Sequence, residues 1–357
     1  MSPVVREEPN AWGERLRAAA VAGQLSDLPF VQQPAWAASK AFTGWESSRL
    51  VAQDGAAWAG AQFLLQRLPA GLGRIAYAPR GPIVVAAHAE QAAALRSEVL
   101  RGLSDLRRDD VTLVRLEPGE SAPLPEVADQ VHPDDTFSTS LRAPWLTAGS
   151  DAGLTLRRAR PVQPSTSRRI DLTGGAEGVR AAWRSKWRQY ARHATESGVT
   201  VRAAGGDGAD SLFAAMSSIA QRTGVKTRSS AAFARIIDAF NGEAEILIAE
   251  STTGEVLGAL LVITSGTTTT ELFGGATDAG NEARAPYALK VAAIERAVAR
   301  GSATYDMWGI STSGIAHFKA GWGGAPVVYP GALDVDLDPL RGPLVRLALR
   351  LRGFGTP

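Results

Sequence analysis

The same order of predicted helices and strands occurs twice along the chain, and this duplication constrains the fold more than any single motif. The first half is predicted to contain a helix, a two-stranded hairpin, a third strand, a second helix and a returning strand. These elements are predicted at Pro34–Phe42, Ser48–Gln53, Trp58–Leu65, Arg74–Ala78, Ala87–Leu106 and Val111–Leu116. The Asp54-Gly55 pair between the first two strands is typical of a hairpin turn.

The second half repeats this order about 190–200 residues later, beginning with a pair of helices. Its elements are predicted at Asp210–Arg222, Ser230–Phe240, Glu245–Glu250, Val256–Thr264, Thr267–Phe273, Pro286–Arg300 and Ala303–Trp308. A three-stranded antiparallel meander followed by a helix and a returning strand is typical of the GNAT acyltransferase fold. The sequence therefore predicts an α/β (α+β) chain of two tandem GNAT-like domains, each a mixed twisted sheet with flanking helices.

The two repeats suggest domain limits. The first domain is predicted at residues 1–165 and the second at residues 166–325, and residues 326–357 are expected to pack back on the first domain and complete it. Between the repeats, Pro118–Ser167 is rich in proline, serine and aspartate. Within it, SAPLPEV (Ser121–Val127) and RPVQPSTS (Arg160–Ser167) are predicted to form turns or linker.

Composition excludes several kinds of site. The 357 residues include no cysteine, which excludes disulfides, thiolate metal ligands and cysteine nucleophiles. The four histidines are isolated from one another and no HExxH spacing occurs, so we expect neither a metal nor a cofactor. The longest apolar run, Val256–Thr264, is too short to cross a bilayer, and MSPVVREEPN lacks the apolar segment of a signal peptide. These features favour a cytoplasmic location.

One lysine stands in an apolar, glycine-rich segment, YDMWGISTSGIAHFKAGWGG, at Tyr305–Gly324. A lysine held by structured backbone can stabilise a developing oxyanion or bind a phosphate, so Lys319 is a candidate catalytic residue. The alternative is a solvent-facing lysine on a short helix at His317–Ala320.

The densest basic stretch contains no acidic residue, and its members are Arg180, Arg184, Lys186, Arg188 and Arg192. Trp183, Trp187 and Tyr190 follow helical spacing there and predict one aromatic stripe that faces a core. The basic side chains predict contact with the phosphates of a tRNA, and the alternative is a solvated helix face.

Five motifs are spread over nearly the whole chain. They are QQPAWAASKAFTGW (Gln32–Trp45), YAPRGP (Tyr77–Pro82), LVRLEPG (Leu113–Gly119), WRSKWRQYARHATESGVTVR (Trp183–Arg202) and Tyr305–Gly324. In this order they resemble the motifs of the Fem family (FemABX), the tRNA-dependent aminoacyltransferases that form peptidoglycan cross-bridges. The resemblance implies transfer of glycine, alanine or serine from aminoacyl-tRNA to the side-chain amine of a stem peptide. The acceptor would be lipid II or UDP-MurNAc-pentapeptide, and a lipid-linked acceptor would bring the protein to the inner face of the membrane.

The resemblance also implies roles for single residues. Lys319 is expected at the substrate cavity, where it stabilises the charge that develops in the transition state. Lys40 and Arg222 are expected to contact acceptor phosphates, and Glu117 stands where the family has an aspartate, to hold the acceptor amine or take its proton. The other substrate contacts expected from the resemblance are Arg80 and Phe273.

Structural alternatives remain open for these residues. Lys40 is compatible with an exposed helix end, Arg222 with a helix C-terminus, Glu117 with a turn before Pro-Gly and Arg80 with a neighbouring acid. The chain also departs from the family pattern. It has no segment for the two-helix arm of some members, and it carries Phe273 or a neighbouring threonine where the family offers a tyrosine.

Other functions remain as alternatives. A GNAT-type N-acyltransferase holds the coenzyme A pyrophosphate on backbone amides of a Q/R-x-x-G-x-G/A loop. The equivalent segment here, NEARAPYALK (Asn281–Lys290), lacks those glycines, and Pro286 removes an amide. A tRNA-dependent aminoacyltransferase acting on a specialised metabolite, and a non-catalytic lipid- or nucleotide-binding module with the same fold, are the remaining alternatives.

Overall fold

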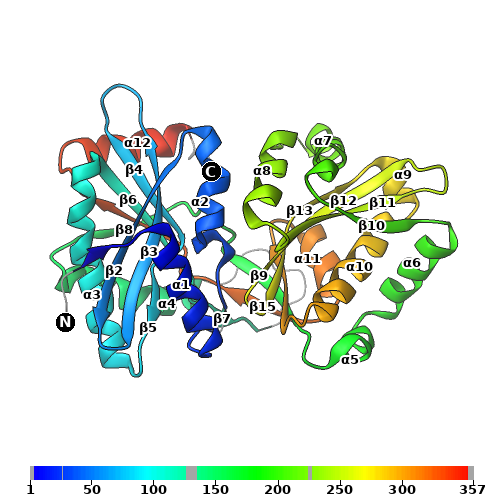
Figure 1. Ribbon diagram of the computed structural model, residues 1–357, viewed down its shortest axis with the longest axis horizontal. Helices are drawn as coiled ribbons and strands as arrows, with labels where there is room; N and C mark the ends of the chain where they lie inside the picture. The colour runs from blue at the N-terminus through cyan, green and yellow to red at the C-terminus, as the bar shows by residue number, and fades with distance from the viewer. Residues whose placement is uncertain (1–3, 26, 126–134, 224–226, 353–357) are drawn as a thin grey trace. The chain divides into compact units, whose positions relative to one another are not determined.

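The computed structural model describes residues 4–25, 27–125, 135–223 and 227–352, apart from the side chains at positions 135, 222, 223 and 352. The chain forms two compact units. The first consists of Met1–Leu124, His132–Thr166 and Val327–Pro357, and the second of Pro125–Val131 and Ser167–Pro326. Each unit has its own sheet, flanking helices and core (Figure 1).

The sheet of the first unit is mixed. Its strands have the order β1-β2-β3-β4-β6-β16-β8, and β5 pairs with β3. Their bounds are β1 (Val5–Arg6), β2 (Glu46–Asp54), β3 (Ala57–Arg67), β4 (Arg74–Arg80), β5 (Ile83–Val85), β6 (Val111–Pro118), β8 (Leu156–Ala159) and β16 (Ala332–Asp336). β4 and β6 are parallel, and the helix α3 (Ala89–Gly102) makes the crossover that a parallel pair requires.

β16 comes from the last part of the chain and lies between β6 and β8, antiparallel to both. Arg115 of β6 stands opposite Asp334 of β16, and both side chains are buried. The guanidinium donates from Nε to Oδ1 over 2.8 Å and from Nη2 to Oδ2 over 2.9 Å. The C-terminal residues are therefore an integral part of the first unit.

Helices cover both faces of this sheet. α3 and α4 (Asp135–Asp151) pack on one face, where Leu95 and Trp145 join the core. α1 (Pro9–Val21) packs its Trp12 edge-on against Trp58, with ring centroids 5.6 Å apart. On the same face as α1, α12 (Arg341–Arg352) packs Val345 against β4 and β6. α2 (Pro34–Lys40) follows α1 along the chain.

The sheet of the second unit has the strand order β10-β11-β12-β13-β14-β9. Its strands are β9 (Thr166–Asp171), β10 (Thr200–Ala204), β11 (Ala244–Glu250), β12 (Val256–Ser265), β13 (Thr268–Ala276) and β14 (Thr304–Gly309). β10 to β13 are antiparallel, whereas β13 and β14 are parallel. The pairing of β13 with β14 ends at Thr270 and Asp306, so the remainders of the two strands diverge.

Seven helices are described in the second unit. They are α5 (Gly175–Ala181), α6 (Ser185–Glu196), α7 (Ala209–Thr223), α8 (Ser230–Phe240), α9 (Asp278–Glu282), α10 (Ala285–Ala299) and α11 (Ser313–Ala320). α7 and α8 cover one face of the sheet, and α10 with α6 and α5 covers the other (Figure 1). The remaining strands, β7 (Ala122–Pro123) and β15 (Ala325–Val328), are short.

The predicted fold class is confirmed, with two mixed sheets and flanking helices. α4 and β8, which lie between the two predicted linker segments, were not predicted. Trp145 and Ala148 of α4 are buried three residues apart on one helix face. Pro144 and several serines and threonines give the same segment the composition of a loop. α1, β5, β16 and α12 were not predicted either.

Two further observations bear on the class of protein. Within the described ranges, no helix is both long enough and apolar enough to cross a membrane. Among the same residues, no three histidine, aspartate or glutamate side chains are grouped as metal ligands.

The buried Arg115–Asp334 pair generates a stability prediction. Asp334→Ala leaves a buried guanidinium without its counter-charge, so it is expected to lower the free energy of unfolding by about 3–5 kcal/mol. Urea unfolding followed by far-UV circular dichroism measures the loss. Glu250→Ala, which breaks the half-exposed Arg202–Glu250 pair, is the matched control and should cost less than about 1 kcal/mol. A similar cost for the two variants would show that the buried pair contributes no more than a surface pair.

Candidate active site

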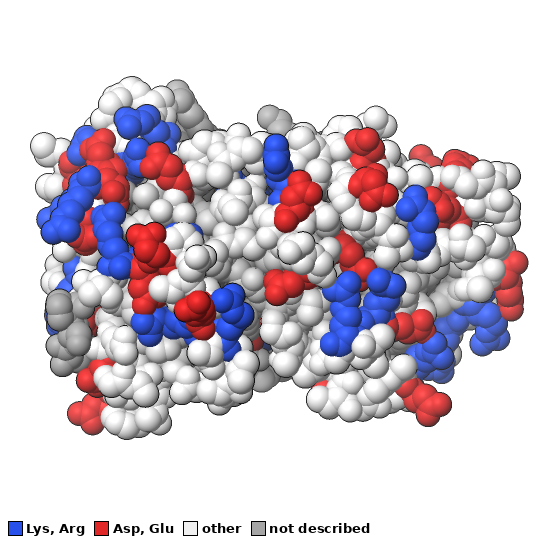
Figure 2. Space-filling view, in the orientation of Figure 1, with Lys and Arg blue, Asp and Glu red and all other residues white. Residues whose placement is uncertain are grey.

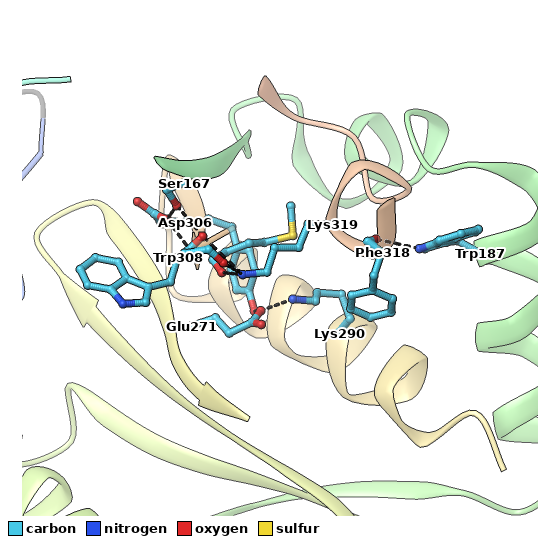
Figure 3. Close-up of polar contacts among 11 residues, drawn as sticks. Ser167, Trp187, Glu271, Lys290, Asp306, Trp308, Phe318 and Lys319 are labelled. Atoms are coloured by element: carbon cyan, nitrogen blue, oxygen red, sulfur yellow. Dashed lines mark hydrogen bonds and ion pairs between the residues drawn. The ribbon is translucent and has the colours of Figure 1, made fainter. Parts of the chain in front are cut away.

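Lys319 is buried on α11, and its ammonium group is surrounded by main-chain oxygens. Nζ donates to the carbonyl oxygens of Met307, Trp308 and Gly309, the last two over 3.3 Å and 2.6 Å (Figure 3). The side chain is 8% exposed, which excludes the solvent-facing lysine that the sequence left open. All three ammonium protons are directed at the end of β14.

The end of β14 needs these donors because its ladder is interrupted. β9 pairs with β14 up to Asp306 and again at Gly309, so residues 307 and 308 form an irregularity. Trp308 adopts a left-handed backbone with φ 57°. Its carbonyl also accepts from Ser167 Oγ over 2.9 Å, and its amide donates to Asp306 Oδ1 over 2.7 Å. A buried carbonyl without a donor is costly, and Lys319 supplies donors in place of a strand partner.

Burial lowers the pKa of Lys319 from 10.5 to about 8, because the charged form loses its hydration. Lys290 acts in the same direction by repulsion, whereas the carboxylates of Glu271 and Asp306 oppose the shift. The side chain therefore remains a cation at neutral pH, and its charge is shielded from water.

A second charged cluster lies beside Lys319, where β13 and β14 diverge (Figure 3). Lys290 of α10 is buried and forms an ion pair with Glu271 of β13. Tyr305 of β14 donates its hydroxyl to Glu271 Oε2 over 3.0 Å. Burial first, and then the charge of Glu271, raises the pKa of Tyr305 well above 10, so Tyr305 is a neutral phenol that donates a hydrogen bond to Glu271.

The sequence analysis missed Glu271 and Lys290, although one signal was present. Lys290 lies three residues after Tyr287 and four before Ile294, so it shares one face with these two hydrophobic residues of the helix predicted at Pro286–Arg300. A lysine at such a position needs a buried partner. Glu271 directly follows a run of four threonines in the preceding predicted strand, and it is the acidic partner of Lys290.

A cavity of about 440 Å³ opens beside this cluster within the second unit. Its walls include Glu271 and Lys290, the strand glycines Gly274 and Gly275, and residues of α10 and α11. At Gly275 the close packing of α7 requires a glycine, because a Cβ there would lie 2.8 Å from the Ala215 carbonyl. A mostly apolar cavity with a few charged groups is typical of a ligand site.

A second, more open cavity of about 670 Å³ adjoins the first, and the two share Arg284 and Tyr287. Its other lining residues are Arg184, Ser185, Lys186, Trp187, Tyr190 and His317. Tyr190 and Tyr287 meet at a steep angle, with ring centroids 5.0 Å apart, and the Arg284 guanidinium lies 4.4 Å from the Tyr190 ring centroid. The wall therefore combines positive charge with aromatic faces.

The basic stretch does not form the single helix that was predicted. α5 ends at Ala181 and α6 begins at Ser185, so Trp183 lies between helices, where Arg184 turns the chain before α6. Trp183 and Trp187 are nevertheless buried, and Trp187 fits only because Gly321 has no side chain. A Cβ at Gly321 would lie 2.3 Å from the Trp187 ring.

All five predicted tRNA-binding side chains are exposed. Figure 2 shows lysine and arginine side chains gathered over the region where Figure 1 places α6. Arg184 and Lys186 line the second cavity. Arg180 pairs with Glu295, and Arg188 donates to the Trp183 carbonyl. Two of the five, Arg184 and Lys186, therefore line the cavity. The other three lie elsewhere on the surface.

Glu117 lies at the end of β6 in the first unit and is fully buried. Its carboxylate accepts from the Val162 amide, from the Gln163 amide over 2.9 Å and from the Tyr77 hydroxyl over 3.0 Å. Burial raises the pKa of Glu117 above its usual range, and these hydrogen bonds and Arg80 oppose the rise. The Glu117 carboxylate therefore holds the backbone of residues 162 and 163, just before β9, by hydrogen bonds.

Arg80 and Lys40 are also buried in the first unit. Arg80 donates to the Pro164 carbonyl over 2.8 Å, and its guanidinium lies 3.3 Å from the Tyr329 ring centroid. Lys40 Nζ lies 3.8 Å from the Trp36 ring centroid, a cation–π contact. Lys40 is therefore not the exposed helix end that the sequence left open.

Of the last two predicted substrate contacts, Phe273 does not line the cavity. Phe273 is half-buried on β13 and packs against Phe233, with ring centroids 5.4 Å apart, and beneath the guanidinium of Arg228. The backbone of Arg222 belongs to the last turn of α7, and its side chain lies outside the described residues.

The fold is that of a tandem GNAT-like protein. The model of the FemAB family matches residues 23–255 and 250–350, so the chain belongs to the FemAB family. The family resemblance of the sequence motifs is confirmed.

Solved structures support the same fold. A crystal structure of FemX matches with a TM-score of 0.77 at 15% identity, covering 97% of this chain and 99% of that one. A tandem GNAT protein from the clavulanic acid biosynthesis pathway matches with a TM-score of 0.56 at 13% identity, covering 94% and 98%. A conserved protein of unknown function from Bacteroides thetaiotaomicron VPI-5482 matches with a TM-score of 0.54 at 10% identity, covering 94% and 100%. No curated protein matches the chain.

Proposed function

We propose that the protein transfers a small amino acid, glycine, alanine or serine, from aminoacyl-tRNA to the side-chain amine of a peptidoglycan precursor. The acceptor is the stem peptide of lipid II or of UDP-MurNAc-pentapeptide, and the reaction takes place in the cytoplasm. The observation that carries the proposal is the buried group of Lys319, Lys290, Glu271 and Tyr305 beside a cavity, in a chain of the FemAB family.

The proposed reaction requires the enzyme to position the two reactants and to stabilise the oxyanion that forms between them. The acceptor amine attacks the ester carbonyl, an oxyanion forms, a C–N bond replaces the C–O bond to the ribose, and the ribose oxygen receives a proton. The ester is already activated, so the reaction requires no protein nucleophile. Lys319 and Lys290 place fixed positive charge beside the cavity, where the oxyanion develops. Because the three protons of Lys319 are directed at β14, we assign it an electrostatic and positioning role.

The donor side of the site follows from the two adjoining cavities. The 440 Å³ cavity holds the aminoacyl group, and the Glu271 carboxylate in its wall suits the α-ammonium of that group. The 670 Å³ cavity, with Arg184, Lys186 and Tyr190, suits the negatively charged 3′ end of the tRNA.

The acceptor side rests on the family resemblance. Lys40 and Arg222 are proposed to contact the acceptor phosphates, and Phe273 to make an apolar contact. Glu117 and Arg80 hold main-chain atoms of residues 162–164, so we assign them a positioning role for that segment.

An acyl-CoA-dependent reaction is the second candidate, favoured by the likeness to the tandem GNAT protein and by the position of the cavity at the start of α10. The start of α10 argues against it. Pro286 lacks an amide, and Arg284 adopts a left-handed backbone where the coenzyme A loop has glycine.

Incubation with charged tRNAs decides between these functions. We expect the mass of the stem peptide to rise by one amino-acid residue with glycyl-, alanyl- or seryl-tRNA and either lipid II or UDP-MurNAc-pentapeptide. Mass spectrometry of the acceptor measures the change, and uncharged tRNA is the control. Acylation of an amine with acetyl-CoA, and no change with any charged tRNA, would replace the proposed function by the second candidate.

The lowered pKa of Lys319 predicts a pH dependence of transfer. Lys319 is charged below about pH 8 and neutral above it, so the single-turnover rate should fall as pH rises through about 8. Lys319→Arg keeps its charge in this range and should show no such fall, although its rate below pH 8 is lower. Rates are corrected for spontaneous ester hydrolysis measured without enzyme. Identical pH profiles for the wild type and Lys319→Arg would show that the charge of Lys319 does not contribute to catalysis.

The two classes of basic residue on α6 predict different salt effects. Lys186→Gln removes a charge from the cavity wall, so it should raise KM for aminoacyl-tRNA and reduce the slope of log(kcat/KM) against log(salt) by about one. Arg192→Gln, which removes an exposed charge on the same helix, is the matched control and should change the slope less. Equal effects would show that the cavity wall has no special part in tRNA binding.

A further inference from the structure

Four large apolar side chains at the C-terminal helix of the first unit face solvent. Leu340 is 80% exposed, Leu344 56%, Leu347 54% and Leu351 78%. They are spaced four, three and four residues apart, so they form one stripe along α12 and the residue before it. Of the large exposed hydrophobic residues described in the whole chain, no other helix carries such a stripe.

The opposite face of α12 fixes the direction of this stripe. Val345 is buried against Ile75 of β4 and Leu113 of β6, and the half-buried Leu349 packs against the same cluster. Arg346 is tied to Asp336 by an ion pair of 2.9 Å. The helix is therefore anchored on the sheet, and the exposed leucines are its outward surface.

The charge on α12 has a single sign. Every charged residue of the helix is an arginine, and the members are Arg341, Arg346, Arg350 and Arg352. Arg341 pairs with Asp338 and Asp110 at the start of the helix, whereas Arg350 is exposed. A leucine face flanked by arginine is typical of helices that lie in the interface of an anionic bilayer.

The neighbouring hairpin extends this surface. Leu68 and Leu72, in the turn between β3 and β4, pack against the same cluster as Leu349, and a Cβ at Gly73 would lie 3.2 Å from Arg341. Figure 1 shows this turn projecting beside α12. Arg67 at the end of β3 is exposed and adds a further positive charge.

We propose that this face of α12 docks the protein onto an anionic lipid surface, with Leu344, Leu347 and Leu351 at the boundary between headgroups and acyl chains. The exposed Arg350 and Arg67 reach lipid phosphates, which the planar guanidinium binds with paired hydrogen bonds. A second copy of the chain is a poorer occupant, because a two-fold pairing of these helices would bring arginines of like charge together. The proposal concerns a binding surface and holds whichever donor and acceptor the enzyme uses.

Vesicle co-flotation without any tRNA or peptidoglycan precursor tests the surface. The vesicles are phosphatidylcholine alone or with about a quarter of phosphatidylglycerol. We expect about tenfold more protein on the anionic vesicles, and about a tenfold loss of that binding for the double variant Leu344→Gln/Leu347→Gln. The double variant Val21→Gln/Leu146→Gln, which changes exposed apolar residues elsewhere in the first unit, should bind as the wild type does.

Thermal unfolding checks that both double variants keep the fold, which is expected because the changed side chains are exposed. Failure of the wild type to bind anionic vesicles overturns the proposal, and so does equal binding by the two double variants. A wild-type dimer in sedimentation experiments that Leu344→Gln/Leu347→Gln abolishes, without vesicle binding, would assign the stripe to a second copy. None of these outcomes depends on aminoacyl transfer.

Discussion

The divergence of β13 from β14 in the second unit is the constraint on which the rest of the site depends. Parallel pairing stops at Thr270 and Asp306, and residues of β13 beyond this point, Glu271 and Gly274 to Ala276, line the cavity. The divergence also leaves the carbonyl groups at the end of β14 without regular strand partners. Lys319 satisfies these carbonyls, and its cation interacts with Glu271, which lines the cavity.

Burial of this cation is unfavourable, and the surrounding groups keep it charged. Desolvation favours the neutral amine, whereas three carbonyl dipoles and the charges of Glu271 and Asp306 favour the ammonium. Lys290 forms an ion pair with Glu271. The two lysines and their carboxylates form one coupled unit, so the polarity of the cavity wall is set by the fold of the second unit alone.

Features that depend on a local sequence pattern were predicted correctly. Interactions whose partner is distant in the sequence, or is a main-chain atom, were not. α8 was predicted with its observed bounds, because its apolar stripe and its Ser229 cap are local signals. The sequence identified Lys319 as a candidate, but it could not predict the hydrogen-bond acceptors of Lys319, because they are backbone oxygens that no motif encodes. Likewise, Glu117 binds amides of residues 162 and 163, which a turn-rich sequence does not reveal. α4 was missed because its few buried positions are diluted by proline, serine and threonine.

The place of β16 between β6 and β8 has a consequence for how the chain folds during synthesis. Until the ribosome has made residues 332–336, one edge of β6 and the whole of β8 lack their strand partner. The main part of the second unit, Ser167–Pro326, is encoded between β8 and β16, so it can emerge and fold while the first unit is incomplete. The nascent protein therefore exposes an open sheet edge for the time needed to translate about half of its length, a state in which chaperone binding or strand exchange competes with closure.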